Sequence, residues 1–373
     1  MLRCGDGAFR HPRSRSAAPR HGPRRGGYTR AVSMSDACAL VQAAVDRGDI
    51  PGAAIAIGDA RDVSIACLGA VAPDDAPVTP DTWYDLASLT KVIATTTLLL
   101  RDIMRGTIDP SASLSAYLPE ASWLQAAPRL GDATVSDCAH HATGLPAWRP
   151  FYTQGLTREA LIAQVLQSPL EHAPGTVVYS DLGFITLGHL LERVNGERLD
   201  ALFAREIADE AFAADLRFGH VGEPCAPTEK CPWRSRLLRG EAHDENASVM
   251  DGVSGHAGLF GTIAGVAGFC HAILNERLLT HNALQFVSRR PRQGASGERR
   301  GFGWALASPG WSGGDLCSDR SIGHTGFTGT GLWIDLERDA FAVLLTNRVH
   351  PTRHRETGIV GLRRRFANAA FAR

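Results

Sequence analysis

One long segment, residues 88–105, constrains the fold more than any other part of this chain. Its sequence, SLTKVIATTTLLLRDIMR, is almost uncharged, and Gly106 follows it. Such a run ending at glycine predicts a helix, and a helix that is apolar on most sides must be buried in a large core. No stretch of about 18 apolar residues occurs anywhere, so we expect no membrane span. The chain therefore has to surround this helix with other elements.

The rest of the chain is rich enough in apolar residues to build such a core. Of the 373 residues, 44% are hydrophobic, which suits one large core or two closely packed subdomains. Lys plus Arg, at 39, equals Asp plus Glu, at 39, so no net charge attracts nucleic acid or an anionic membrane. The eight cysteines are scattered, form no CxxC pair and are expected to be reduced. These features predict a globular, enzyme-sized protein.

The first 33 residues differ from the rest in composition. They are rich in Arg, Pro and Gly, contain a single acidic residue, Asp6, and show no apolar period, so we expect residues 1–33 to be disordered. The pair Arg24-Arg25 is not followed by the apolar core that a twin-arginine export signal needs. We expect translation to begin at Met34, with a transit peptide or a basic arm as alternatives, and we expect a cytoplasmic location.

Strand signals lie near both ends of the chain, and helical signals lie between them. Residues 51–73 contain two β-rich apolar runs around a polar turn at 59–62, which predicts a hairpin. Residues 323–349 contain two or three strand-like runs, and a last amphipathic helix follows. Between these ends the pattern is mostly helical and is broken by Pro and Gly.

This order predicts a mixed α/β fold of the α+β kind. One antiparallel sheet is built from both ends of the chain and flanked by helices, and an all-helical subdomain is inserted. We expect residues 34–373 to form one domain, with an α/β part at about 34–90 and 246–373 and a helical part at about 91–245. A cleft between the two parts is the expected place for a site.

Ser88 and Lys91, at the start of the buried helix, are the first candidates for chemistry. Positions i and i+3 share a helix face, so the two side chains can meet. A serine N–H at a helix start is free to stabilise an oxyanion, and a lysine in a dry cleft loses its proton more readily and becomes a usable base. The alternative is that Ser88 is a simple helix cap, because Ser-x-x-Lys alone is a common tetrapeptide.

A second candidate segment contains Tyr179 and Asp181, in a loop just before an apolar helix. The tyrosine is suited to relaying protons, and the aspartate to holding Lys91 or a substrate amide. Alternatively, Asp181 caps the helix and Tyr179 fills the boundary between the two parts.

A third candidate segment is GHTGFTGTG near the C-terminus. His324, Thr325 and Gly326 are expected to begin a strand that is followed by Phe327. A sheet-edge strand beside the serine offers backbone groups to a substrate, and glycine allows a close approach. The alternative is a glycine-rich hairpin with a satisfied histidine.

Together the three motifs resemble those of the serine penicillin-recognising superfamily. There, Ser-x-x-Lys is followed by Tyr-x-Asn or Ser-x-Asn, and then by Lys-Thr-Gly or His-[Ser/Thr]-Gly. The segments ASLTK, HHATGLPAW and YSDLGFITLGHLLERVNG are similar to the class C β-lactamase-related branch, which includes penicillin-binding proteins, D-aminopeptidases, esterases and muropeptide amidases. The resemblance covers about residues 36–366. It implies a β-lactamase/transpeptidase-like fold and a serine hydrolase without metal or cofactor.

The resemblance also implies a role for each motif residue. Ser88 is acylated by the substrate, and Lys91 takes or holds its proton. Tyr179 completes the relay and helps to activate the deacylating water. The N–H groups of Ser88 and Phe327 form the oxyanion hole.

Asp181 and His324 depart from the best-known form of the family's motifs. Aspartate cannot donate a hydrogen bond as an amide does, although it can pair with Lys91 and raise the pKa of that lysine. Histidine replaces a lysine whose fixed charge meets a substrate carboxylate, so this charge is weaker or depends on pH. We therefore expect poor penicillin turnover. A peptidoglycan-derived amide or peptide is the favoured substrate, small esters or β-lactams come next, and a non-catalytic sensor is the alternative of another class.

The loop around residues 243–256 contains further polar residues. Asp244 and Asn246 are candidate substrate contacts. The histidines nearby show no HExxH motif or ligand-rich spacing, so hydrogen-bonded loop residues are favoured over a metal site. The predicted partner is a small-molecule or muropeptide substrate, and the sequence makes no prediction of the oligomeric state.

Overall fold

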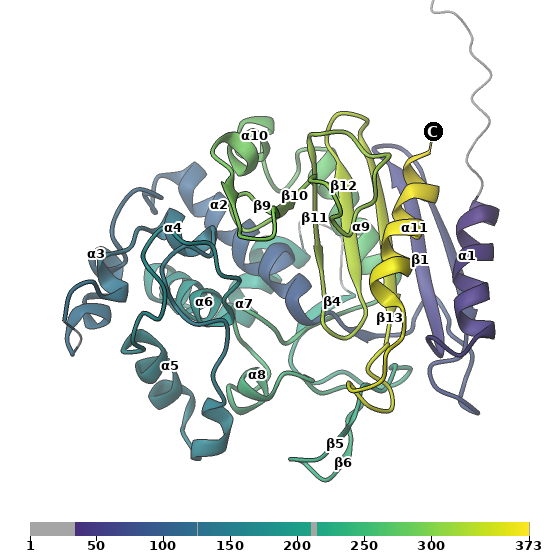
Figure 1. Ribbon diagram of the computed structural model, residues 1–373, viewed down its shortest axis with the longest axis horizontal. Helices are drawn as coiled ribbons and strands as arrows, with labels where there is room; N and C mark the ends of the chain where they lie inside the picture. Colours follow the sequence, from purple (N-terminus) through teal and green to yellow (C-terminus); the bar gives the residue numbers. More distant parts are fainter. Residues whose placement is uncertain (1–33, 125, 210–214, 373) are drawn as a thin grey trace, which may run out of the picture. The chain divides into compact units, whose positions relative to one another are not determined.

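The computed structural model describes residues 34–124, 126–209 and 215–372 (Figure 1). The predicted disorder of residues 1–33 lies outside the described residues.

An antiparallel sheet of eight strands organises the fold, in the order β2-β1-β13-β12-β11-β10-β9-β8. The predicted N-terminal hairpin is confirmed, because β1 pairs antiparallel with β2. On its other side β1 pairs with β13, so that the two ends of the chain meet within the sheet. The strands are β1 (Gly52–Asp59), β2 (Val63–Gly69), β8 (Arg292–Gln293), β9 (Arg299–Arg300), β10 (Ala305–Leu306), β11 (Ser321–Thr325), β12 (Gly331–Asp335) and β13 (Ala340–Thr346).

Each face of this sheet packs against its own hydrophobic core. In β1 the odd-numbered residues from Ala53 to Ile57 belong to one core, and Ala54 and Ala56 belong to the other, as the alternation of side chains along a strand requires. The prediction of an antiparallel sheet flanked by helices is therefore confirmed. Two helices cover the first face and one covers the second (Figure 1): α1 (Met34–Asp46) and α11 (Ile359–Phe371), and then α9 (Ile263–Leu274).

The second part of the fold is mostly helical and lies beside the β11 to β8 side of the sheet (Figure 1). Its core is continuous with the one that α9 shares with the sheet. Its α-helices are α2 (Thr97–Arg105), α3 (Leu114–Tyr117), α4 (Val135–Ala139), α5 (Arg158–Leu166), α6 (Asp181–Asn195), α7 (Leu199–Phe203) and α8 (Glu245–Val249). Helix α10 (His281–Arg289) precedes β8.

The prediction that the middle of the chain is all-helical is wrong for residues 216–237. A short strand there pairs with β7, which also pairs with β3 just before Ser88, and a two-stranded hairpin follows. These strands have two or three residues each, too few to show a period of two. They are β3 (Tyr84–Asp85), β4 (Leu216–Phe218), β5 (Lys230–Cys231), β6 (Arg236–Leu237) and β7 (Leu259–Gly261).

The buried segment at 88–105 is helical, as predicted, but its first turns are not α-helical. A 3₁₀ turn, η1 (Ala87–Leu89), leads into a π-helical stretch, η2 (Lys91–Thr96), and then into α2. The wider π turn is accompanied by a bond from Thr97 Oγ1 to the carbonyl five residues earlier, at 2.8 Å. Gly106 ends α2 in the left-handed region, at φ 74°. No helix among the described residues has the length and apolar character needed to cross a membrane.

Candidate active site

Ser88 lies in a tight turn between β3 and the buried helix. The residue before it, Ala87, has a φ of 47°, in the left-handed region that a side chain with a Cβ disfavours. The buried carboxylate of Asp85 accepts the Ala87 N–H at 2.7 Å and the His243 N–H at 2.6 Å. Thr90 Oγ1 donates to the Ala87 carbonyl at 2.6 Å. The turn that presents Ser88 is thus strained and held by side chains on both sides.

Lys91 connects Ser88 to the helical part of the fold. Its side chain is fully buried, and Nζ donates to Ser88 Oγ at 3.0 Å and to the His256 carbonyl at 3.0 Å. The same nitrogen lies 2.7 Å from the carboxylate of Asp181, whose side chain is 19% exposed. The structure therefore brings together the two ends of the Ser-x-x-Lys motif and the aspartate of the second motif.

The pKa of Lys91 is raised, so the expectation that a dry cleft makes it lose its proton more readily is wrong. Burial does act to lower this pKa, and it is the largest single effect. The charge of Asp181, the charge of Tyr179 and hydrogen bonds to both residues together outweigh it. Pairing with Asp181, which we expected to raise the pKa of Lys91, is the largest of these opposing effects. Lys91 is an ammonium ion at neutral pH.

Tyr179 lies at the centre of a group of nitrogen-bearing side chains. The His141 and His324 rings lie 4.6 and 5.8 Å from its ring, centroid to centroid. Lys91 Nζ lies 5.0 Å from the ring centre, and the guanidinium carbon of Arg300 lies 5.1 Å from it. These contacts hold the phenol ring in place and surround it with cations, which favour its electron-rich face.

Ser180, rather than Asp181, caps helix α6. Its Oγ accepts the Gly183 N–H at 3.3 Å, and Asp181 is the first residue of the helix. The Ser180 N–H donates to His141 Nδ1 at 3.0 Å. The alternative in which Asp181 is merely the cap is therefore excluded, and its carboxylate is turned to Lys91 instead.

His324 and Thr325 end strand β11 instead of beginning a strand, which corrects the sequence prediction. Gly326 follows β11, and a turn leads to β12. Burial lowers the pKa of His324 well below its usual range, and the charges of Arg300 and Lys91 lower it further. His324 is therefore neutral at pH 7 and supplies no fixed positive charge.

The turn at 326–330 is fastened closely to the strand before Ser88. A Cβ on Gly326 would lie 2.5 Å from the Leu86 carbonyl oxygen, which explains why glycine is needed here. Thr330 Oγ1 also donates to Leu86 O, at 3.1 Å. From α11, the buried Arg363 donates to the carbonyls of Gly326 and Thr330 at 2.6 and 2.7 Å. Phe327 is thereby held beside Ser88, with 49% of its surface exposed.

Only one of the two loop candidates reaches the site. Asp244 caps α8, its carboxylate is hydrogen-bonded to His256 Nε2 at 2.9 Å, and it lines the cavity at Ser88. Asn246 is fully buried: its amide accepts the Tyr152 N–H at 3.0 Å and donates to the Arg149 carbonyl at 2.8 Å. Its role is to hold the 149–152 segment, so the structure does not place it as a substrate contact.

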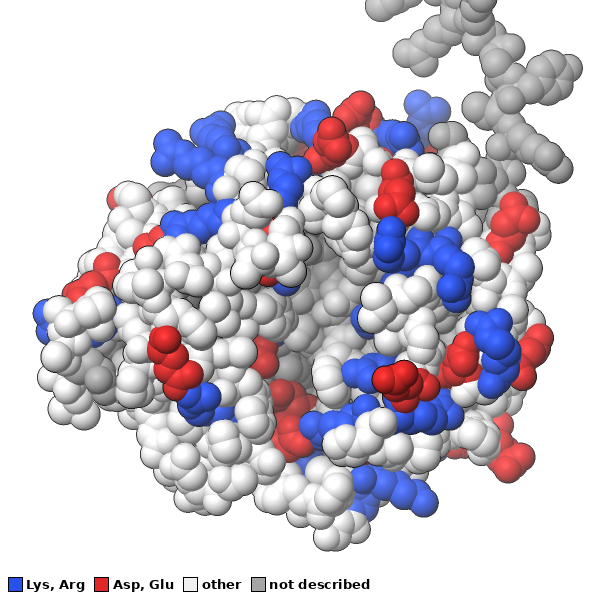
Figure 2. All heavy atoms as spheres, viewed as in Figure 1, with Lys and Arg blue, Asp and Glu red and all other residues white. Residues whose placement is uncertain are grey.

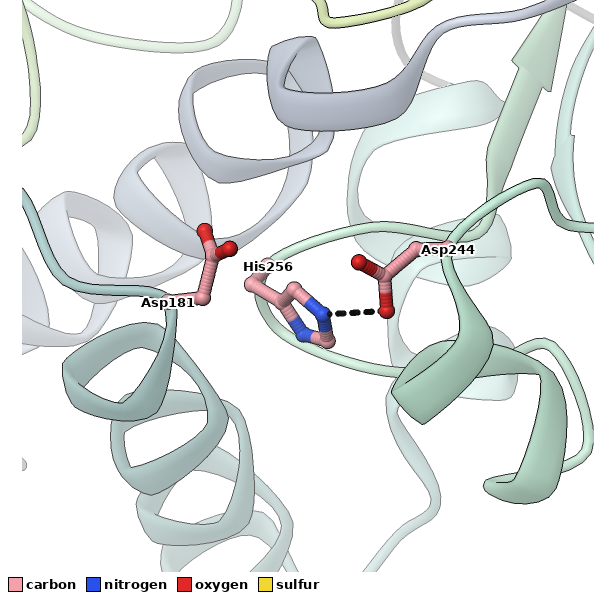
Figure 3. Close-up of side chains that lie close together, drawn as sticks. All are labelled: Asp181, Asp244 and His256. Atoms are coloured by element: carbon pink, nitrogen blue, oxygen red, sulfur yellow. Dashed lines mark hydrogen bonds and ion pairs between the residues drawn. The ribbon is translucent and has the colours of Figure 1, made fainter. Parts of the chain in front are cut away.

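Asp181, Asp244 and His256 lie close together (Figure 3), and each offers one donor atom within 4.8 Å of the others. This is a donor set that a divalent cation accepts. However, the Lys91 ammonium already lies against Asp181, and both ring nitrogens of His256 have partners, Ser254 Oγ and Asp244. The positive charge beside these carboxylates is supplied by the chain itself, so we assign them no metal.

Ser88 lies in the wall of two cavities. The larger has a volume of about 560 Å³ and the smaller about 350 Å³, and Ser88, Tyr179 and Phe327 line both. His324, Thr325 and Gly326 line the larger cavity, and Asp181 and Asp244 line the smaller one. Figure 2 shows the surface hollowed between the helical part and the sheet, with basic side chains bordering the hollow on the side of the sheet.

Four residues of the site were not found by reasoning from the sequence. Asp85 precedes Ser88 in the YDLAS segment, and His141 belongs to the HHATGLPAW segment. Arg300 and Arg363 have no local signal, because each reaches the site only through the pairing of β9 and the docking of α11.

Comparison with known proteins agrees with this geometry. The chain is 31% identical to an N-acetylmuramyl-L-alanine amidase of Bacillus subtilis, over 72% of this chain and 68% of the relative. It is 29% identical to a putative D-alanyl-D-alanine carboxypeptidase of Escherichia coli, over 73% of this chain and 70% of the relative. The structure of EstCE1, a hydrolase with promiscuous acyltransferase activity, has the same fold, with a TM-score of 0.72, 19% identity and coverage of 90% of this chain and 98% of that one.

The family model for beta-lactamase matches residues 38–363. This range includes all three motifs and most of the described fold. The chain belongs to the beta-lactamase family of serine hydrolases.

Proposed function

We propose that the protein hydrolyses a peptidoglycan-derived amide through an acyl-enzyme on Ser88. The observation that carries this proposal is the contact of Lys91 Nζ with Ser88 Oγ, at 3.0 Å, in a turn that opens into both cavities. A nucleophile in hydrogen-bonding contact with a group that can handle its proton is the arrangement that covalent catalysis needs.

Lys91 is already protonated before the reaction, so it can accept the Ser88 proton only if it gives up one of its own protons. As Ser88 Oγ attacks the carbonyl carbon, Lys91 takes the hydroxyl proton while it passes one of its own to Asp181, 2.7 Å away. The N–H groups of Ser88 and Phe327 stabilise the oxyanion. Tyr179 donates its phenolic proton to the departing amine as the C–N bond breaks, and it is reprotonated by Lys91, which takes back the proton that Asp181 holds. Water then attacks the ester, and the carboxylic acid leaves as the Ser88 hydroxyl reforms.

Two observations favour a muropeptide amide over a simple ester. The first is the likeness to a relative named as an N-acetylmuramyl-L-alanine amidase. The second is a row of aromatic rings, each at least partly exposed, that begins at the smaller cavity. Trp148 lines that cavity. The ring of Tyr152 lies 6.2 Å from the ring of Trp148, and the ring of Trp233 lies 4.8 Å from that of Tyr152, centroid to centroid. Flat apolar faces at the edge of a polar cleft suit the face of a sugar ring.

The likeness to a putative D-alanyl-D-alanine carboxypeptidase keeps peptide, ester and β-lactam hydrolysis as alternatives. The neutral His324 argues against efficient use of β-lactams, because it supplies no fixed charge for their carboxylate. The cytoplasmic location stays a prediction from the sequence.

The test is a hydrolysis screen with the purified protein and its Ser88→Ala variant. The substrates are a MurNAc-peptide, a D-Ala-D-Ala peptide, nitrocefin and short p-nitrophenyl esters. We expect release of the peptide amine from the MurNAc-peptide, fluorophosphonate labelling of Ser88, and a loss of at least about 1000-fold in Ser88→Ala. Ser235→Ala, at an exposed serine of the β5–β6 hairpin, is the matched control. If no labelling and no hydrolysis of any of these substrates depends on Ser88, the proposed hydrolase is overturned in favour of the non-catalytic sensor.

A further inference from the structure

A third cavity, of about 440 Å³, shares no lining residue with the two cavities at Ser88. One of its walls belongs to the helical part and contains Thr134, which caps α4, together with Ser136 and His140. The other wall belongs to the end of α10 and to β8. The proposed hydrolysis uses none of these residues, yet the volume of the cavity is in the range of small-molecule sites.

Three arginines, Arg289, Arg290 and Arg292, line this cavity, and one of them is balanced within the chain. Arg292 forms an ion pair with Asp137, which is the only carboxylate among the described residues of the cavity lining. The Asp137 carboxylate also accepts the N–H of Thr134 at 2.9 Å and its hydroxyl at 2.7 Å. This pair joins the two walls of the cavity and leaves no negative charge over for the other arginines.

Arg289 and Arg290 have no such partner. Arg289 is the last residue of α10, Arg290 follows it, and both side chains are exposed. In the part of the chain that the structure describes, neither side chain forms an ion pair or a hydrogen bond. Figure 2 shows basic side chains gathered near α10. The cavity therefore carries two positive charges that the described residues do not balance.

The opposite wall supplies a hydroxyl donor. His140 Nδ1 lies 2.7 Å from the Ser136 carbonyl oxygen, which can only accept, so Nδ1 carries a proton. Ser136 Oγ lies 3.3 Å from the same nitrogen and can only accept from it, so the Ser136 hydroxyl proton is left for a ligand. Phe286, which is partly buried, gives the cavity an apolar side.

A phosphate monoester matches these features. Its charge at pH 7, about −1.5 to −2, equals that of the two unbalanced arginines with opposite sign. A guanidinium binds two phosphate oxygens with paired hydrogen bonds, and the third oxygen is left to accept from Ser136. The cavity has room for more than the phosphate group, and the ring of Phe286 offers a flat apolar face to a sugar or a base.

We propose that the cavity between α4 and α10 binds a phosphorylated small molecule, a sugar phosphate or a nucleotide, through Arg289, Arg290 and Ser136. The chain as a whole has no net charge to attract anions, so the attraction is local to this cavity. This inference goes beyond the proposed hydrolysis and does not depend on it.

Isothermal titration calorimetry at fixed ionic strength tests this with two pairs of probes. The first pair is glucose 6-phosphate and glucose, and the second is AMP and adenosine. We expect at least one phosphorylated probe to bind with a Kd of about 1 mM or lower, and at least about 10-fold more tightly than its unphosphorylated counterpart. The pair that shows this difference identifies the ligand as a sugar phosphate or a nucleotide.

The double variant Arg289→Gln/Arg290→Gln should weaken this binding by about 10-fold or more, because it removes both charged donors. The matched control, Arg61→Gln/Arg320→Gln, removes the same charge from two exposed arginines elsewhere and should leave the affinity unchanged. Ser88→Ala should also bind the probe as the wild type does. Circular dichroism checks that each variant is folded.

Several outcomes would overturn the inference. One is that neither phosphorylated probe binds at concentrations up to about 10 mM. Another is binding that survives in the Arg289→Gln/Arg290→Gln variant, or that weakens equally in the control pair, which would indicate a general attraction of charge. Loss of binding in Ser88→Ala would place the ligand in a cavity at Ser88 instead. None of these measurements involves turnover, so the proposed hydrolysis is tested separately.

Discussion

The ammonium of Lys91 lies 2.7 Å from the carboxylate of Asp181, at the interface of the sheet and the helical part. Lys91 comes from the first motif and Asp181 from the second, 90 residues later in the chain. An amide at position 181 could not hold this charge, so the aspartate changes the state of the lysine as well as its hydrogen bonding. The pair sets the pKa of Lys91 and therefore the path that a proton from Ser88 has to take.

Replacing Asp181 with asparagine is expected to lower the pKa of Lys91. Burial, which acts to lower this pKa, remains in the variant, while the strongest opposing charge is removed. The chain contains two lysines, Lys91 and Lys230, so a Lys230→Arg background leaves one ¹³C-labelled lysine signal to titrate by NMR. We expect the midpoint to lie above the usual lysine value when Asp181 is present and below that value in Asp181→Asn.

The control for this titration is Asp319→Asn, which removes an exposed carboxylate from another part of the chain. It should leave the Lys91 signal unchanged. An unchanged midpoint in Asp181→Asn would mean that Asp244 and Tyr179 hold the charge on their own. The stability that the Lys91 pair contributes is present below the unfolded lysine pKa and is lost as the pH rises through the raised folded value.

Buried neutral histidines make the stability of the fold depend on pH below about 6.5. The pKa values of His141 and His324 are both lowered well below the usual range, first by burial and then by the nearby cations. The unfolded chain binds protons that the folded chain does not, so stability is complete above the unfolded pKa and falls as the pH drops toward the folded one.

His324→Gln should therefore make the free energy of unfolding less dependent on pH. Each neutral histidine adds a slope of about 1.4 kcal/mol per pH unit, so the slope between about pH 5 and 6 should fall by that amount. Urea unfolding at a series of pH values measures it. His281→Gln, at an exposed histidine of α10, is the control and should leave the slope unchanged. An equal slope in the wild type and His324→Gln would show that His324 is protonated in the folded state.

Much of the fold follows from patterns that a single sequence displays. The hairpin β1–β2 and the strands β12 and β13 are apolar runs between clear turns, and the segment 88–105 is too apolar to lie at a surface. What could not be predicted is short or depends on distant partners. Strands β8, β9 and β10 have two residues each, and they are strands only because β10 pairs with β11, β9 with β10 and β8 with β9.

The features of the site also divide into those that the sequence predicts and those that it does not. Ser88, Lys91, Tyr179 and His324 stand in motifs whose order along the chain is informative, and the fold brings them together. We expected His324, Thr325 and Gly326 to begin a strand, whereas His324 and Thr325 end β11. The short run before His324 contains too few apolar residues to reveal β11. The charged state of Lys91 depended on a balance between burial and pairing that sequence alone does not weigh.

Arg363 is expected to act on the reaction without touching the substrate's reacting atoms. It holds the carbonyls of Gly326 and Thr330, and so the turn that presents the Phe327 N–H. Arg363→Met removes both bonds, and a small displacement of this donor should lower kcat for esters by about 10-fold or more with little change in KM. Arg363→Lys should recover part of kcat. A change in stability with an unchanged kcat would show that Arg363 serves only the packing of α11.

Asp85 should position Ser88 by holding the turn at Ala87, as Arg363 holds the turn at 326–330. Its carboxylate accepts the N–H groups of Ala87 and His243, and in Asp85→Ala both donors lose their partner inside the protein. We expect the free energy of unfolding to fall by about 2 to 6 kcal/mol, because the two buried donors left without acceptors each cost about 1 to 3 kcal/mol. Asp85→Asn keeps the size and one acceptor, so its loss of stability should be about half as large.

Kinetics distinguish positioning by Asp85 from a purely structural role. If the carboxylate holds the strained φ of Ala87, then Asp85→Asn should lower kcat and the rate of fluorophosphonate labelling while KM stays close to the wild-type value. Asp75→Asn is the matched control, because Asp75 is a carboxylate of the sheet part that pairs with Arg239 away from Ser88. Full labelling in a destabilised Asp85→Asn would mean that the turn keeps its shape without the bond, and that the strain at Ala87 is borne by Thr90 and the β3–β7 pairing instead.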